Sequence, residues 1–281
     1  MKAKYLNPFT DFGFKKLFGE EVSKHLLIDF LNELMPEKHH IQDLFYRKTE
    51  QLGTTTLDRK AIFDLYCENT RGDKFIVELQ KAKQNFFKDR TLFYSTFPIR
   101  EQAEKGEWDY QLQPVYCVGI LDFIFEEHPE DRYIQRVQLK NEACEVFYDK
   151  LTFVFIEMPK FRKSEAELSS HFDKWLYFLK NLEDFEEIPA SLREEIFEQA
   201  FSVAEIAKFN PAQLEAYEQS LKYYRDLKNV IDTAAMEARA LGREEGITEG
   251  LTKGRIEGRE EGMLEGLDKG KMMGKSEEKI T

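Results

Sequence analysis

Two acidic side chains and an amide stand at positions that could bind a metal ion. Asp64 lies in one strand-like run, and Glu78 and Gln80 lie in the next, within the sequence IFDLYCENTRGDKFIVELQ at 62–80. Both runs are rich in Ile, Phe, Tyr and Val, and a turn-forming cluster around Arg71 separates them, which predicts a β-hairpin. A loop centred on Arg71 places Asp64 directly opposite Glu78.

Alternation along the two predicted strands sorts their side chains into two faces. One face carries Asp64, Glu78 and Gln80 together with Ile62, Tyr66 and Ile76. The other face is apolar and carries Phe63, Leu65, Cys67, Phe75, Val77 and Leu79. The Cβ atoms of directly opposed residues lie about 4.5–5.5 Å apart, and like charges at that distance destabilise a sheet. A divalent cation between the two carboxylates would offset this repulsion.

A half-exposed hairpin offers a second interpretation of the same pattern. Such a hairpin alternates polar and apolar residues by default, and two acids on its wet face would simply be hydrated. The register also decides which face is which, because a shift of one residue exchanges the faces. Both interpretations are open at this point.

The composition allows a sizeable core but limits the attraction to nucleic acid. The chain has 281 residues, of which 42% are hydrophobic, and this length fits one large domain with an appendage or two domains. The net charge of −12 argues against a broad attraction to DNA. Residues 71–105 include eight basic and five acidic side chains, which is a local excess of positive charge. Lys83, Lys88 and Arg90 are the candidate DNA contacts, and a solvated helix face is the simpler interpretation of each one.

The cysteines and the first residues predict a cytoplasmic protein. Cys67, Cys117 and Cys144 share no CxxC spacing, and buried reduced thiols are expected. The start of the chain, MKAKYLNPFTDFG, lacks the apolar run of a secretory signal. No segment approaches the roughly eighteen consecutive apolar residues of a membrane span, so no membrane partner is expected.

The rest of the sequence predicts helices packed on a mixed sheet. Apolar residues recur at helical spacing over 11–35, with a break expected at Gly19, and Thr10 or Asp11 can cap this helix. Further strands are predicted over 41–50, 114–125, 133–140 and 150–158, and further helices after Gln80, from about 164, over 192–209 and over 211–241. Together these elements predict an α/β fold whose mixed sheet has five or six strands flanked by helices.

The C-terminal tail has a regular repeat, in which glycine recurs at every fourth position from Gly242 to Gly274. Each glycine inside a helix costs on the order of 1 kcal/mol relative to alanine, so nine of them disfavour a lone helix. The tail is therefore expected to be a flexible or conditionally helical extension. The expected organisation is a core over 1–160, a helical region over 161–241 and the repeat tail over 242–281, with a homo-oligomer forming through the C-terminal helices or the tail.

Several segments together resemble one family of enzymes. They are NPFTDFGFKKLFG at 7–19, Asp64, IVELQ at 76–80, and RTLFYSTFPIREQAEKGEWDYQLQPVYCVGILDF at 90–123. The chain resembles the PD-(D/E)XK nuclease superfamily, in the branch of recombination-promoting nucleases or putative transposases, and its glycine repeat is similar to the tails of many such proteins. The resemblance implies a restriction-endonuclease-like sheet and DNA as the partner.

The resemblance also implies roles for the hairpin residues. Asp64 and Glu78 would bind Mg²⁺ or Mn²⁺, and Gln80 would complete the catalytic set, so that Glu78-x-Gln80 stands in place of the superfamily's (D/E)-x-K. Carboxylate-bound metal ions can activate water and relieve the charge that builds on a phosphate during hydrolysis. Alternation along the strand points Glu78 and Gln80 the same way and Lys81 to the opposite face.

Other charged residues would support this set. Because the Gln80 amide carries no charge, Lys60, Lys83 or the metal itself would have to compensate for the missing lysine. Asp11 could reach the site as an accessory ligand, although a role as helix cap is the simpler explanation.

The leading hypothesis is a metal-dependent DNA endonuclease linked to recombination or mobile elements. The alternative is a catalytically weak or inactive nuclease-fold protein that acts as an oligomerising interaction module, which the acidic charge and Gln80 favour. No nucleophile elbow or Ser-His-Asp spacing is present, and the five histidines form no ligand pattern.

Overall fold

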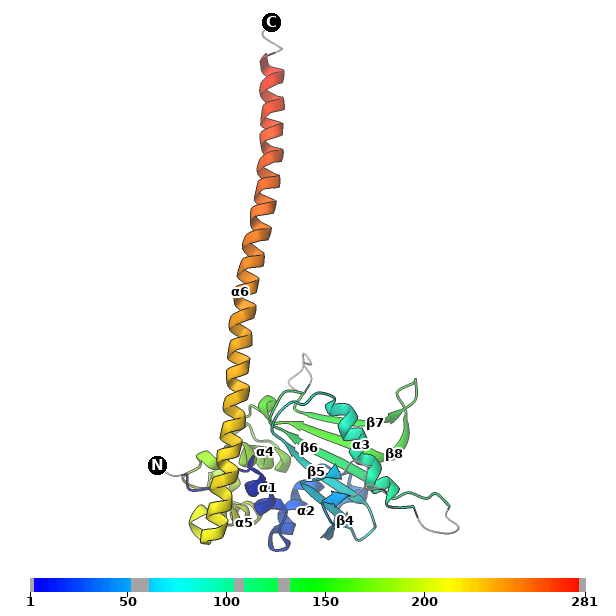
Figure 1. Cartoon of the computed structure of the whole chain (residues 1–281). Helices are drawn as coiled ribbons and strands as arrows, with labels where there is room; N and C mark the ends of the chain where they lie inside the picture. Colours follow the sequence, from blue (N-terminus) through cyan, green and yellow to red (C-terminus); the bar gives the residue numbers. More distant parts are fainter. Residues whose placement is uncertain (1–2, 52–60, 104–108, 126–131, 278–281) are drawn as a thin grey trace. The chain divides into compact units, whose positions relative to one another are not determined.

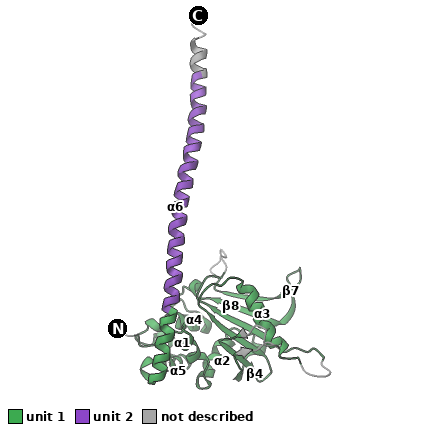
Figure 2. Cartoon of the chain, in the orientation of Figure 1, with its two compact units in different colours: residues 1–224 green, residues 225–281 purple. Residues whose placement is uncertain are grey.

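The computed structural model describes residues 3–51, 61–103, 109–125 and 132–277. The chain divides into two compact units, Met1–Tyr224 and Arg225–Thr281 (Figure 2). The first unit contains the sheet and all the shorter helices, and the second consists of the greater part of the last helix. The boundaries expected near residues 160 and 241 stay predictions.

A six-stranded mixed sheet forms the centre of the first unit (Figure 1). Its strands, in spatial order, are β1 (Leu44–Tyr46), β4 (Leu65–Asn69), β5 (Lys74–Gln80), β6 (Val115–Leu121), β8 (Val146–Glu157) and β7 (Ile134–Lys140). β5, β6 and β8 are parallel to one another, and the outer pairs are antiparallel. Every residue of β6 is buried, as expected for a parallel strand covered on both faces. The predicted mixed sheet and its central apolar strand are confirmed.

The strand predicted over 41–50 has a different extent. β1 covers only three residues of it, and a separate two-stranded ladder pairs β2 (Glu50–Gln51) with β3 (Ala61–Ile62). β3 is also distinct from β4, so the first arm of the predicted hairpin is interrupted.

Four helices cover one face of the sheet. They are α1 (Asp11–Phe18), α2 (Lys24–Asn32), α4 (His171–Asn181) and α5 (Glu195–Ala204). Their apolar side chains, among them Phe30 and Trp175, share one hydrophobic core with Val77 of β5. The helix predicted over 11–35 breaks at Gly19, as expected, and α1 ends there. Val22 is exposed because it lies in the short turn between α1 and α2.

One helix, α3 (Phe87–Arg100), covers the opposite face of the sheet (Figure 1). It packs on a second apolar cluster that contains Tyr66, Ile76 and Cys117. The Tyr66 hydroxyl donates a hydrogen bond to Glu101, which directly follows the helix and ties it to β4. Apolar layers of described residues therefore cover β4 and β5 on both faces.

The hairpin has the predicted register, with Leu65 paired to Val77 and Cys67 paired to Phe75. Its turn contains Gly72 at a φ of +85°, a conformation that glycine adopts without steric cost. The predicted alternation fails before Leu65, at Asp64 and at Phe63. The Phe63 ring contacts Tyr66 at 5.6 Å between centroids on the α3 side, away from Leu65, because the chain bends at Asp64 before β4 begins.

Two of the three cysteines are buried, as expected. Cys67 and Cys117 lie inside the sheet layers, and burial raises the pKa of both thiols. The prediction is wrong for Cys144, which is exposed at the turn between β7 and β8 and has a φ of +61°.

The last helix, α6 (Pro211–Glu277), continues without interruption through the glycine repeat. The tail is thus helical in this structure, where a flexible or conditionally helical segment was expected.

The helix predicted over 192–209 is shorter, since α5 ends at Ala204 and a single turn, Ile206–Lys208, follows it. Within the described ranges, no helix combines the length and the apolar character needed to cross a membrane. Self-association through α6 stays a prediction.

Replacing glycines of the repeat should increase the stability of the C-terminal helix. A Cβ added at Gly250 or Gly254 would meet no atom within 4 Å, so Gly250→Ala and Gly254→Ala should each stabilise the helix by about 1 kcal/mol. Hydrogen exchange of the surrounding amides should slow by about fivefold for each substitution. Gly13→Ala is the contrasting variant, because its Cβ would lie 2.2 Å from the Asn7 carbonyl oxygen and should destabilise the first unit. Unchanged exchange in the tail would contradict the helical assignment.

Candidate functional site

The hairpin brings the two predicted carboxylates together. Asp64 directly precedes β4, and Glu78 lies near the end of β5. The backbone N–H of Leu79 donates to Asp64 Oδ2 at 2.7 Å, and the backbone N–H of Asp64 donates to Glu78 Oε1 at 3.3 Å. Each carboxylate is therefore held by the backbone of the opposite strand, just where the regular strand pairing stops.

Burial makes this carboxylate pair hard to ionise fully. Burial, and after it the negative charge of Asp64, raises the pKa of Glu78 to about 8. Burial also raises the pKa of Asp64, while the hydrogen bond from Leu79 opposes that shift. Since the Glu78 side chain is only 15% exposed and Asp64 is half-buried, the interpretation of two freely hydrated acids is wrong.

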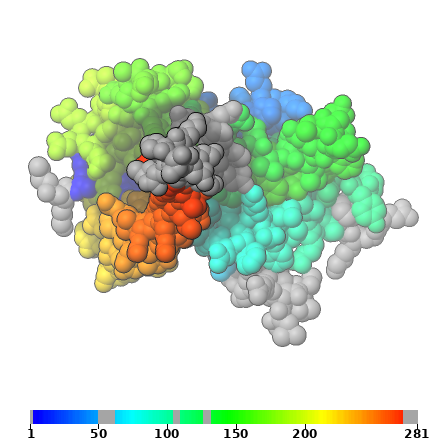
Figure 3. Space-filling model, turned by 90° about the horizontal axis from the view of Figure 1, so that it is seen from above, coloured from blue at the N-terminus to red at the C-terminus, as the bar shows by residue number. Residues whose placement is uncertain are grey.

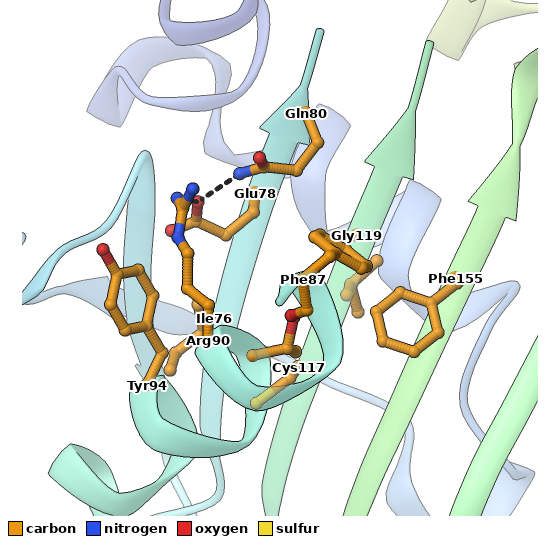
Figure 4. Close-up of a pocket in the computed structure, with 11 residues that line it drawn as sticks. Ile76, Glu78, Gln80, Phe87, Arg90, Tyr94, Cys117, Gly119 and Phe155 are labelled. Atoms are coloured by element: carbon orange, nitrogen blue, oxygen red, sulfur yellow. Dashed lines mark hydrogen bonds and ion pairs between the residues drawn. The ribbon is translucent and has the colours of Figure 1, made fainter. Parts of the chain in front are cut away.

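Gln80 orients one member of the pair. Its side chain is buried, and its Nε2 donates to Glu78 Oε2 at 3.0 Å (Figure 4). The amide thus fixes the Glu78 carboxylate without adding a charge to the site. Alternation along β5 directs both side chains to the face that α3 covers, as predicted.

Arg90 of α3 lies beside the same carboxylate. Its guanidinium is 3.9 Å from Glu78 Oε2 and 5.0 Å from the centroid of the Tyr94 ring. It also donates a hydrogen bond to Gln84. At 3.9 Å the guanidinium approaches Glu78 without a hydrogen bond to it. Arg90 therefore lies in the site itself, whereas the sequence had suggested it only as a candidate DNA contact.

Two hollows border the pair. Glu78, Gln80 and Arg90 line a pocket of about 30 Å³ against α3, which has room for a water molecule or an ion (Figure 4). Asp64 lines a larger cleft of about 550 Å³, which it shares with Asp11 of α1. The carboxylates thus open to solvent from different sides, one along α1 and one along α3.

Asp11 is not the cap of its helix. The Gly13 N–H donates to Thr10 Oγ1 at 2.9 Å, so Thr10 is the cap, and Asp11 is the first helical residue. Asp11 forms an ion pair with Lys15 at 3.0 Å, and its negative charge contributes to the raised pKa of Asp64. The helix-cap explanation of Asp11 is therefore wrong, and its role as a ligand stays a prediction.

Lys81 is a charged residue of the site that the sequence pattern did not predict. It is half-buried, its Nζ lies 5.6 Å from the centroid of the Tyr223 ring, and burial lowers its pKa, whereas the charges of Asp11 and Asp64 oppose that shift. The alternation of β5 had already directed it away from Gln80. The bend at Asp64 turns the Asp64 carboxylate toward the side of the sheet on which Lys81 lies. No pattern in the sequence predicts this bend.

The other candidate cations lie elsewhere. Lys83 and Lys88 are both exposed, and Lys88 Nζ lies 5.3 Å from the centroid of the Phe125 ring. Lys60 lies outside the described residues. Compensation for Gln80 by Lys83 therefore has no support in the geometry.

A metal ion would find few protein ligands here. Among the described residues, no group of three or more His, Cys, Asp and Glu side chains could hold a metal. Two carboxylates are nevertheless a donor set that suits Mg²⁺, which proteins commonly bind through one or two carboxylates together with water and substrate phosphates. The half-buried, mutually repelling pair of Asp64 and Glu78 fits such an ion.

Comparison with known proteins agrees with this geometry. The mixed sheet flanked by helices is consistent with an α/β nuclease-like fold. The model of a family described as PD-(D/E)XK nuclease family transposase matches residues 8–234, and the chain therefore belongs to that family. The resemblance drawn from the sequence is confirmed. No curated protein and no solved structure matches the chain.

The raised pKa of Glu78 predicts how stability changes with pH. A carboxyl with a raised pKa favours folding at low pH, and this contribution is lost as the pH rises from about 4.5 to about 8. The glutamine in Glu78→Gln carries no charge at any pH, so this variant should not lose stability as the pH rises. In EDTA it should therefore be more stable than the wild type at pH 8 by on the order of a few kcal/mol. Urea unfolding at pH 5 and pH 8 measures the difference.

The control for this comparison is Glu142→Gln, at an exposed position in the β7–β8 turn. It should leave the pH dependence of the wild type unchanged. If Glu78→Gln retained the full loss of stability between pH 5 and pH 8, the buried and repelled state of Glu78 would be excluded.

Proposed function

We propose that this protein is a divalent-metal-dependent DNA endonuclease that hydrolyses phosphodiester bonds and is linked to recombination or mobile elements. Asp64 and Glu78 are its metal ligands, and the ion is Mg²⁺ or Mn²⁺. The observation that supports this most is the carboxylate pair itself, which is half-buried and fixed by the backbone of both strands. Membership of a nuclease family supports the same class of reaction.

The cost of keeping this pair is the physical argument for a cation. Two neighbouring acids that contributed only to folding would be more stable as amides, because burial and mutual repulsion penalise their ionised forms. A bound divalent ion supplies an activated water and relief of the charge on the phosphate. Its binding needs both carboxylates ionised, so affinity should increase with pH until Glu78 loses its proton near pH 8.

The neighbours of the pair have distinct roles in this proposal. Gln80 holds the Glu78 carboxylate in one orientation through its 3.0 Å hydrogen bond. Lys81 supplies positive charge on the side of Asp64 and replaces the lysine that the motif lacks at position 80. Asp11 serves as an accessory acid in the Asp64 cleft, through water or the ion. Lys83 and Lys88 contact the DNA backbone, and Arg90 acts at the phosphate next to Glu78.

Removal of either carboxylate tests the proposed function. Asp64→Asn and Glu78→Gln should each reduce Mg²⁺-dependent cleavage of DNA by about 100-fold or more, because one ligand of the ion is lost. Calorimetric titration with Mn²⁺ should show the loss of binding directly, and Glu142→Gln should bind and cleave as the wild type does. Cleavage that survives both substitutions would exclude this site.

The charge assigned to Lys81 can be tested against its neighbour. Lys81→Gln should lower the cleavage rate by about 10-fold or more, since a half-buried cation beside Asp64 is lost. Lys83→Gln removes an exposed charge on the same segment, and it should weaken DNA binding mainly at low salt, with little change in the rate at saturating DNA. Equal effects of the two substitutions on the saturated rate would contradict the role of Lys81.

A further inference from the structure

An exposed aromatic ring stands next to the site without an evident structural purpose. The Phe86 side chain is 79% exposed, although it directly precedes Phe87, which is buried and lines the pocket with Glu78 and Gln80. Phe86 has a φ of 59° and a ψ of 32°, the left-handed region that bulky side chains rarely adopt. Glycine or asparagine would fit this backbone better, so packing and backbone preference both leave the choice of phenylalanine unexplained.

The backbone of Phe86 is tied to the helix that carries Arg90. The Arg90 N–H donates to the Phe86 carbonyl oxygen at 2.9 Å, in the first turn of α3. The guanidinium of the same Arg90 reaches to 3.9 Å from Glu78 Oε2. Phe86 is thus attached to the end of the helix that carries the site's own arginine. The part of the chain that includes α3, coloured from cyan to teal, forms part of the molecular surface in Figure 3.

The charge around the ring favours an anionic partner. The segment 81–90 contains four basic residues and only one acid, Asp89, in a chain whose net charge is −12. Lys83 and Lys88 are both exposed beside Phe86 in the sequence. Lysine is depleted from the buried centres of protein–protein interfaces, whereas aromatic rings among cations are the usual means of binding single-stranded nucleic acid.

We infer that Phe86 stacks on an unpaired base of a single-stranded DNA segment whose backbone lies along Lys83 and Lys88 and leads to the carboxylate pair. The inference rests on the proposed nuclease function and specifies its substrate. A base inside a duplex is already stacked on both sides, so an exposed protein ring can accept only a base that has left the helix. The protein therefore acts on single-stranded DNA, or on duplex DNA that is open at the site of attack.

The test uses the full-length protein in EDTA, where cleavage does not interfere. The probes are a single-stranded oligodeoxynucleotide that contains 2-aminopurine and the fully paired duplex of the same sequence. Phe86→Ala should bind the single strand about 5- to 100-fold more weakly and lose the fluorescence change of the stacked 2-aminopurine. Its affinity for the duplex should stay unchanged. Phe86→Tyr, which keeps a ring, should restore both properties.

A matched control separates this role from the loss of any exposed ring. Phe147 of β8 is 80% exposed, so Phe147→Ala removes an equally exposed aromatic ring from another element and should bind both probes as the wild type does. The thermal unfolding of both alanine variants should be close to that of the wild type, because neither ring is buried.

The remaining outcomes overturn the inference. It fails if Phe86→Ala keeps the wild-type affinity and fluorescence change, or if wild-type protein binds neither probe. It also fails if the substitution changes the sedimentation of the protein alone, since Phe86 would then lie in a contact between copies. Mg²⁺-dependent cleavage and Mn²⁺ binding, measured in parallel on wild type and Phe86→Ala, decide separately whether the proposed nuclease function stands.

Discussion

The site depends on two half-buried carboxylates that the fold keeps close together. The N–H of Leu79 and the N–H of Asp64 each donate to the carboxylate from the opposite strand. These bonds replace the strand pairing that would otherwise continue beyond Leu65 and Val77. The hairpin thus converts a local interruption of the sheet into a fixed pair of acids, and the energetic penalty of the pair is a reason for it to bind a cation.

The layers around the hairpin sustain this arrangement. Three parallel strands in the middle of the sheet require cover on both faces. The helices α1, α2, α4 and α5 supply it on one face and α3 supplies it on the other. Because α3 lies over β5 and β6, it desolvates Glu78 and brings Arg90 to it. The same packing that stabilises the fold therefore creates the electrostatic conditions of the site.

Much of this could be predicted from local sequence patterns. The register of the hairpin follows from its turn, the buried strand β6 from a continuous apolar run, and the end of α1 from Gly19. The bend at Asp64 could not be predicted, because alternation assumes an unbroken strand and Phe63 is apolar on either face. The place of Lys81 was missed for the same reason. The helical tail was missed because propensity alone weighs heavily against glycine, and the structure shows a continuous helix there.

The start of α6 has a mechanical consequence for the rest of the first unit. The hydroxyls of Tyr217, Ser220 and Tyr224 bond to the Asn7 N–H, the Phe12 N–H and Asp122 Oδ2, at 2.9, 3.1 and 2.8 Å. The Asp122 N–H in turn donates to the Gln80 carbonyl oxygen at 2.9 Å. These hydrogen bonds join the first turns of α6 to the N-terminal segment and, through Asp122, to the Gln80 end of β5, so a displacement of those turns would also disturb the end of the strand that carries Glu78.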